Sequence, residues 1–204
     1  MSTYILIKEN QKKPSVFKSK VNKLYDGVIE CLEKSGLRDN ASFIGTLKKS
    51  ANMAYLEFEG IVDGELIKFE GFSHSKVHKF DINKIHDTSF HKLLLEKFYT
   101  ELNTSYYRDG YVNSDNNTLT FINSSSRRIK DNHWNRSTDA ESRLLENLIL
   151  QCNNGVIQNG FINIYTTFEP CLSCSSKLTE FLKKNLNVKM TVYYDRKYGN
   201  RRER

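Results

Sequence analysis

Two cysteines separated by two residues, Cys171 and Cys174, directly follow Pro170 late in the chain. Proline fits the first turn of a helix, where its missing N–H would have no partner within the helix. The two thiols are therefore predicted to share one face of a helix start, where the helix dipole is expected to lower their pKa and favour the thiolates that bind zinc. A redox pair of cysteines also begins a helix after a strand. Because room for only one helix and one strand remains after this pair, a metal site is favoured over a redox pair.

The segment Thr138-Asp139-Ala140-Glu141 also lies at the predicted start of a helix. Taken alone, Thr138 with Glu141 three residues later is typical of a capping box, in which both side chains bond backbone N–H groups. Taken with the cysteine pair, Asp139 is a candidate third metal ligand and Glu141 a candidate general acid and base. One Cys-x-x-Cys supplies only half of a tetrahedral site, so the second interpretation is favoured.

These two motifs resemble the pair that marks the cytidine deaminase-like superfamily, a His-x-Glu at one helix start and a Pro-Cys-x-x-Cys at another. Residues 164–171, Ile-Tyr-Thr-Thr-Phe-Glu-Pro-Cys, are similar to the strand that leads into the cysteine pair of tRNA adenosine deaminases. The overall layout more closely resembles the deaminase domains of bacterial polymorphic toxins, in which a helix and a hairpin precede the first motif. The resemblance is sharpest over residues 137–194 and extends back to the region of Ser15.

The resemblance implies a Zn²⁺ cofactor held by Asp139, Cys171 and Cys174, with water at the fourth position and Glu141 moving protons. Asp139 replaces the histidine that is usual in this superfamily, although some branches also carry aspartate. A carboxylate oxygen binds zinc at roughly 2.0–2.2 Å, so the site can still close. Three anionic ligands should make zinc a weaker Lewis acid than two thiolates and a neutral imidazole would. The alternatives are a degenerate site that only binds, or a site in which His133 replaces Asp139, which would require its loop to fold back.

Hydrophobic periodicity predicts the elements that carry these motifs. Helical or strand spacing of apolar residues covers helices at 15–37 and 137–152, a β-hairpin at 53–73, and strands at 161–167 and 188–194. The hairpin turns at Asp63-Gly64, and Pro170 opens a further helix between the two late strands. This order predicts an α/β fold, specifically a three-layer α/β/α cytidine deaminase-like sandwich whose mixed sheet has helices on both faces.

We expect a single deaminase domain over residues 1–204, with its core at 15–73 and 137–194. Residues 74–136, with a predicted helix at 90–102 and a short strand at 118–122, form an insertion, and residues 195–204 form a basic tail. Cys31 and Cys152 lie in apolar, helix-like stretches, and both are expected in the core.

The chain carries 31 Lys and Arg against 24 Asp and Glu, a net charge of +7, which favours an acidic partner such as nucleic acid. Ordinary solubility charge is the alternative explanation. No stretch approaches the roughly 18 apolar residues that would span a membrane, and the start lacks a secretory signal pattern. The chain as given is therefore expected in the cytoplasm, without membrane contact, or delivered as part of a larger toxin.

Trp134, His133, Thr167 and Phe168 are candidate contacts to the substrate, because they flank the two motifs and aromatic rings can stack on bases. Core packing is the alternative for each of them. The predicted function is zinc-dependent deamination of cytosine in single-stranded DNA or RNA, with an inhibitory immunity protein as partner if the toxin resemblance holds. Deamination of adenine or of free nucleosides and nucleotides, and a non-catalytic zinc module that binds nucleic acid, remain alternatives. The sequence does not decide the oligomeric state.

Overall fold

The computed structural model describes residues 4–10, 15–34, 52–74, 124–125, 128–129, 139–153 and 155–197. Within these residues the chain forms three helices, a five-stranded sheet and a two-stranded sheet. The elements are β1 (Ile5–Lys8), α1 (Val16–Lys34), β2 (Met53–Val62), β3 (Glu65–His74), β4 (Ser124–Ser125), β5 (Arg128–Ile129), α4 (Ala140–Gln151), β6 (Ile157–Phe168), α5 (Leu172–Lys184) and β7 (Val188–Arg196).

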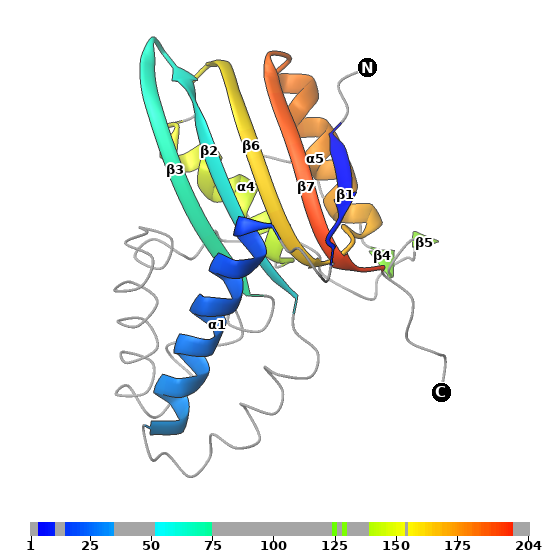
Figure 1. Cartoon of the computed structure of the whole chain (residues 1–204). Helices are drawn as coiled ribbons and strands as arrows, with labels where there is room; N and C mark the ends of the chain where they lie inside the picture. Colours follow the sequence, from blue (N-terminus) through cyan, green and yellow to red (C-terminus); the bar gives the residue numbers. More distant parts are fainter. Residues whose placement is uncertain are drawn as a thin grey trace, which may run out of the picture.

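The main sheet is mixed, with strand order β1-β7-β6-β2-β3. Strand β2 runs antiparallel to β3 and to β6, whereas β7 runs parallel to both β6 and β1. Helix α1 lies on one face of the sheet, and α4 and α5 lie side by side on the other (Figure 1). The predicted three-layer α/β/α sandwich with a mixed sheet and helices on both faces is confirmed.

The hairpin of β2 and β3 closes at the predicted Asp63-Gly64 turn. Both residues have positive φ, 48° at Asp63 and 89° at Gly64. A two-residue turn of this kind needs positive φ at both positions, a conformation that glycine adopts at no steric cost and aspartate tolerates. The turn therefore sets the register in which the alternating apolar residues of β2 face the core.

The main core lies between the sheet and helices α4 and α5. It contains the apolar residues that α4 and α5 turn toward the strands, including Leu144, Leu145, Leu148, Leu178 and Phe181. A Cβ atom added at Gly71 of β3 would lie 2.9 Å from Cδ2 of Leu144, so the glycine lets α4 pack closely on the sheet. This packing holds the beginnings of α4 and α5 beside the C-terminal end of β6.

Helix α1 is attached to the opposite face by aromatic and ionic contacts. Phe17 packs against Tyr55 and Tyr193, with ring centroids 6.4 and 5.3 Å apart. Lys18 Nζ lies 2.6 Å from an oxygen of Asp195 at the end of β7. These contacts cover the end of the sheet nearest the C-termini of β6 and β7.

The predicted elements agree with the structure where both can be compared, with shifted ends. The late strands and the hairpin are present, β6 begins four residues before the predicted strand at 161, and the parallel pair β6–β7 is formed. Strand β1 was not predicted, because four residues are too few to show a period. The predicted helix at 90–102, the strand at 118–122 and residues 198–204 of the basic tail lie outside the described residues. None of the helices in the described part of the chain is both long and apolar enough to cross a bilayer.

Candidate metal and catalytic site

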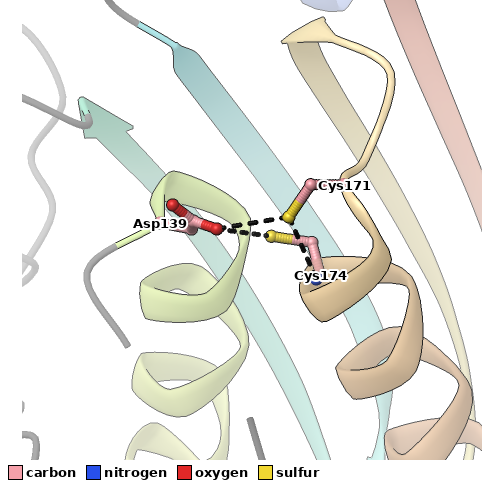
Figure 2. A group of neighbouring side chains, drawn as sticks. All are labelled: Asp139, Cys171 and Cys174. Atoms are coloured by element: carbon pink, nitrogen blue, oxygen red, sulfur yellow. Dashed lines mark hydrogen bonds between the residues drawn. The ribbon is translucent and has the colours of Figure 1, made fainter. Parts of the chain in front are cut away.

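Three side chains at the starts of two helices lie close together beside the C-terminal end of β6. Asp139 precedes α4, and Cys171 and Cys174 begin α5 (Figure 2). Asp139 Oδ2 lies 3.3 Å from the sulfur of Cys171 and 3.5 Å from that of Cys174. One ligand atom from each residue falls within 4.8 Å of the others, and both cysteines are buried. The residues predicted as metal ligands are thus brought together, although Asp139 and Cys171 are 32 positions apart.

Asp139 occupies the N-cap of α4 but does not use its side chain as a cap. Aspartate at this position usually accepts a hydrogen bond from the N–H groups of the first turn. Here no such bond is formed, and the carboxylate points toward the two sulfurs instead. Because the N-cap is Asp139, Glu141 is the second helical residue and does not occupy the position that a capping box with Thr138 requires. A capping box of Thr138 and Glu141 is therefore a weaker explanation of this motif than a metal site.

The cysteine pair is built into the first turn of α5. Cys171 is the N-cap residue, and its sulfur accepts a hydrogen bond from the backbone N–H of Cys174 at 3.4 Å. The hydrogen bond between the two thiols, followed by burial and the carboxylates of Glu141 and Asp139, raises the pKa of Cys174 well above its usual value. We expected the helix start to lower it, but these groups together favour the neutral thiol more strongly than the dipole favours the thiolate. A divalent cation between the three ligands would reverse that preference.

The donor set fits zinc. Zinc binds thiolate sulfur at about 2.3 Å and carboxylate oxygen at about 2.0–2.2 Å, so sulfur and oxygen ligands of a tetrahedral ion stand roughly 3.6 Å apart. The two sulfur–oxygen distances, 3.3 and 3.5 Å, are close to that value. Three protein ligands leave a fourth position for water or substrate, which is the arrangement of catalytic rather than structural zinc sites. A carboxylate beside both sulfurs is expected of a metal site and is not required by a redox pair.

Glu141 lies beside the three candidate ligands and is only 2% exposed. Its Oε2 is 3.5 Å from the sulfur of Cys174, and its Oε1 accepts a hydrogen bond from the hydroxyl of Thr166 at 2.9 Å. Burial raises the pKa of Glu141, and the neighbouring Asp139 carboxylate raises it further. Hydrogen bonds from Thr166 and from the Asn52 side chain act in the opposite direction. A buried carboxyl group with a raised pKa next to three candidate metal ligands has the properties of a general acid and base.

Thr166 and Asn52 belong to this site, and sequence reasoning missed both. Thr166 is fully buried on β6, and its Oγ1 also lies 3.1 Å from Oδ1 of Asn52. The same Oδ1 accepts a hydrogen bond from the backbone N–H of Phe168 at 3.2 Å. Thr166 could have been predicted, because it is a polar residue on the buried face of a strand, five residues before Cys171. Asn52 could not, because it lies near the site only through the pairing of β2 with β6.

A buried ion pair joins α4 and α5 one turn beyond the site. Lys177 is fully buried, and its Nζ lies 2.7 Å from Oγ of Ser142 and 3.3 Å from an oxygen of Glu146. Ser142 follows Glu141, and Lys177 is three residues after Cys174. The network therefore connects the two helices that carry the site's residues.

The other predicted contact residues are placed less centrally. The hydroxyl of Thr167 contacts the backbone of Met53, to its N–H at 3.2 Å and its carbonyl at 3.4 Å. Phe168 is half-buried at the end of β6. His133 and Trp134 lie outside the described residues. A role in binding substrate remains a prediction for all four.

Residues 34–196 match the family model Toxin-deaminase, described as the BURPS668_1122 family of deaminases. This segment covers most of the chain and contains all of the site residues predicted from the sequence. No curated protein matches the chain.

Proposed function

The chain belongs to the BURPS668_1122 family of toxin deaminases, and we propose that it removes the amino group of cytosine in single-stranded DNA or RNA in a zinc-dependent reaction. One observation carries the proposal. Asp139, Cys171 and Cys174 converge from two helix starts, and the buried carboxylate of Glu141 lies beside them. Apart from Asp139 in the place of a histidine or cysteine, this is the arrangement of ligands and carboxylate by which zinc deaminases act on a base.

Each residue has a defined part in the proposed reaction. Asp139, Cys171 and Cys174 would hold the ion. Zinc bound there would supply an activated water for attack on the ring carbon that bears the amino group. Glu141 takes a proton from the attacking water at Oε2, the oxygen that faces the ligands, and passes it to the ring nitrogen. It then passes the remaining proton of the added hydroxyl to the departing amine. In total the base takes up one water molecule and releases ammonia.

The burial of the site supports an unpaired base as substrate. Glu141 and both cysteines are only 2% exposed, so a base within a duplex cannot approach them. A single-stranded or flipped-out base can enter such a site, and the net charge of +7 supports binding to a phosphate backbone. The choice of cytosine over adenine rests on the toxin resemblance. Delivery as part of a larger toxin, and inhibition by an immunity protein, are part of the same proposal.

The test is to sequence DNA and RNA from cells that make the wild-type chain, the Glu141→Gln variant or the Glu65→Gln variant. Glu141→Gln keeps the size of the side chain but cannot accept a proton, so conversions should vanish while zinc content is unchanged. Glu65 is exposed at the start of β3, and its glutamine variant is the matched control that should behave like wild type.

The outcomes separate the alternatives. C-to-T changes in DNA, or C-to-U changes in RNA, that depend on Glu141 would support the proposal and identify the polymer. A-to-G changes would assign the adenine reaction instead. No change in either polymer, with turnover of free cytidine or its nucleotides by the purified protein, would assign a small-molecule substrate. Zinc binding with no turnover of any of these would leave a non-catalytic module.

A further inference from the structure

We propose that Thr166 is a positioning residue that fixes the Glu141 carboxylate for proton transfer, with the Asn52 amide as a second support; this inference rests on the proposed function. The residue would act through Glu141 and would not contact the substrate. The two oxygens of the Glu141 carboxylate have different surroundings.

One oxygen of Glu141 is anchored and the other faces the metal ligands. Oε1 accepts the Thr166 hydroxyl hydrogen bond at 2.9 Å, and Oε2 lies 3.5 Å from the sulfur of Cys174. A bond to one oxygen fixes the plane of the carboxylate, and therefore also the direction of the other oxygen. Thr166 thus holds the side of the group that does no chemistry and leaves the reactive side open.

Thr166 is well suited to this task because it is itself held rigidly. It lies on β6, a central strand, where it pairs with Ala54 of β2 on one side and Tyr194 of β7 on the other. Its side chain is fully buried and β-branched, so its rotation about χ1 is restricted. A hydrogen-bond donor on a sheet is placed more accurately than one on a loop.

Asn52 is a second polar side chain beside the same carboxylate. Its Oδ1 accepts a hydrogen bond from the backbone N–H of Phe168 at 3.2 Å. The Asn52 side chain is hydrogen-bonded to Glu141, and its Oδ1 lies 3.1 Å from the Thr166 hydroxyl. The hydroxyl therefore has two acceptors within reach and can donate to the Glu141 carboxylate or turn toward Asn52.

The anchor matters because the Glu141 side chain can otherwise rotate. Three side-chain torsions separate its carboxylate from its backbone, so without a hydrogen bond at Oε1 the group can adopt other orientations. A displacement of about 1 Å in a reacting group can reduce a rate about 100-fold.

The test compares Thr166→Val, Thr166→Ser and Thr179→Val with wild type. Valine has the shape of threonine without the hydroxyl, and serine keeps the hydroxyl. Thr179 of α5 donates its hydroxyl to a backbone carbonyl at 2.8 Å, so its valine variant makes the same chemical change away from the site. For each protein we would measure kcat and KM on a single-stranded oligonucleotide, the zinc content, and a crystal structure.

For Thr166→Val we expect kcat to fall about 10- to 100-fold with KM within a factor of about two and zinc content unchanged. Thr166→Ser should recover most of the loss, and Thr179→Val should equal wild type. The crystal structure of Thr166→Val should show Glu141 rotated from its wild-type position. Unchanged kcat, or an unmoved carboxylate, overturns the inference. If wild type itself deaminates no base, the proposed function fails, and the crystal structures alone then decide whether Thr166 positions Glu141.

Discussion

Oδ2 of Asp139 lies 3.3 Å from the sulfur of Cys171, across the space between the start of α4 and the start of α5. The two helices are brought together by their common packing on the sheet, and β6 leads directly into the cysteine pair. A metal ion at this point would link the two helices.

The first prediction concerns the three candidate metal ligands. We expect Cys171→Ser, Cys174→Ser and Asp139→Ala each to weaken zinc binding by more than the about 10- to 100-fold that changes to outer hydrogen-bond partners cost. Chelator competition followed by elemental analysis would measure the affinity. Cys152→Ser is the matched control, because Cys152 is buried at the end of α4 and belongs to the apolar core. Full zinc retention in both ligand cysteine variants would contradict the assignment.

The second prediction concerns the buried ion pair of Lys177 and Glu146. Lys177→Met alone leaves the Glu146 carboxylate buried without its cation, and we expect it to cost about 3–5 kcal/mol of unfolding free energy. The double variant Lys177→Met/Glu146→Leu should regain most of this, because two apolar groups need no partner. Urea denaturation of both single variants and the double variant would give the coupling energy.

The control for that experiment is the surface pair of exposed Lys184 and half-buried Glu180, which are 2.8 Å apart on α5. Lys184→Met should cost less than about 1 kcal/mol, because solvent screens an exposed pair. Equal losses from Lys177→Met and Lys184→Met would mean that the buried network contributes little to holding α4 against α5.

The two motifs predicted the family and the convergence of Asp139 with the cysteine pair, and hydrophobic periodicity with the order of elements predicted the layered fold. The motifs could predict the convergence because each lies at a helix start, and helices that follow or precede a common strand are packed beside it. The match of residues 34–196 to a toxin-deaminase family agrees with the resemblance that those motifs carry.

The contacts that surround Glu141 could not be predicted in the same way. Asn52 reaches the site because Ala54 pairs with Thr166, a register that depends on the whole β2–β6 ladder and its bulge near Val62. In the sequence Lys177 looks like an ordinary exposed helix residue, because only the packing of α4 on α5 buries it. The raised pKa of Cys174 likewise depends on carboxylates that are distant in the chain.

The third prediction concerns Cys152, a residue that is only 3% exposed. Burial, with a further contribution from the carboxylate of Asp63, raises its pKa to about 11. A raised pKa means that the thiol is almost wholly protonated at pH 8, and the reactive thiolate is scarce. We expect iodoacetamide to leave Cys152 unmodified in the native protein at pH 8 and to modify it after unfolding in urea. Peptide mass spectrometry would measure the extent of modification in both states. Modification of Cys152 in the native protein at the rate of a free cysteine would show that its thiol is accessible, against the prediction.

The last prediction tests the aspartate that distinguishes this site. On the proposed function, Asp139 gives zinc a third anionic ligand where a histidine would be neutral, and the added charge weakens the ion as a Lewis acid. Asp139→His should therefore keep zinc and shift the acidic limb of the profile of kcat/KM against pH toward lower pH. The direction follows because a stronger Lewis acid favours loss of a proton from bound water at a lower pH, so activity appears earlier as pH rises.

The shift would be measured on a single-stranded oligonucleotide between pH 5 and pH 9, with zinc content determined for every sample. Asp139→Asn is the matched comparison, since it also removes the charge but offers an amide that binds zinc poorly, and it should lose both metal and activity. A histidine variant that keeps zinc and has the wild-type pH profile would mean that the charge of Asp139 does not act on the metal. Its carboxylate, 3.3 Å from the sulfur of Cys171, would then serve only to hold the thiols in place.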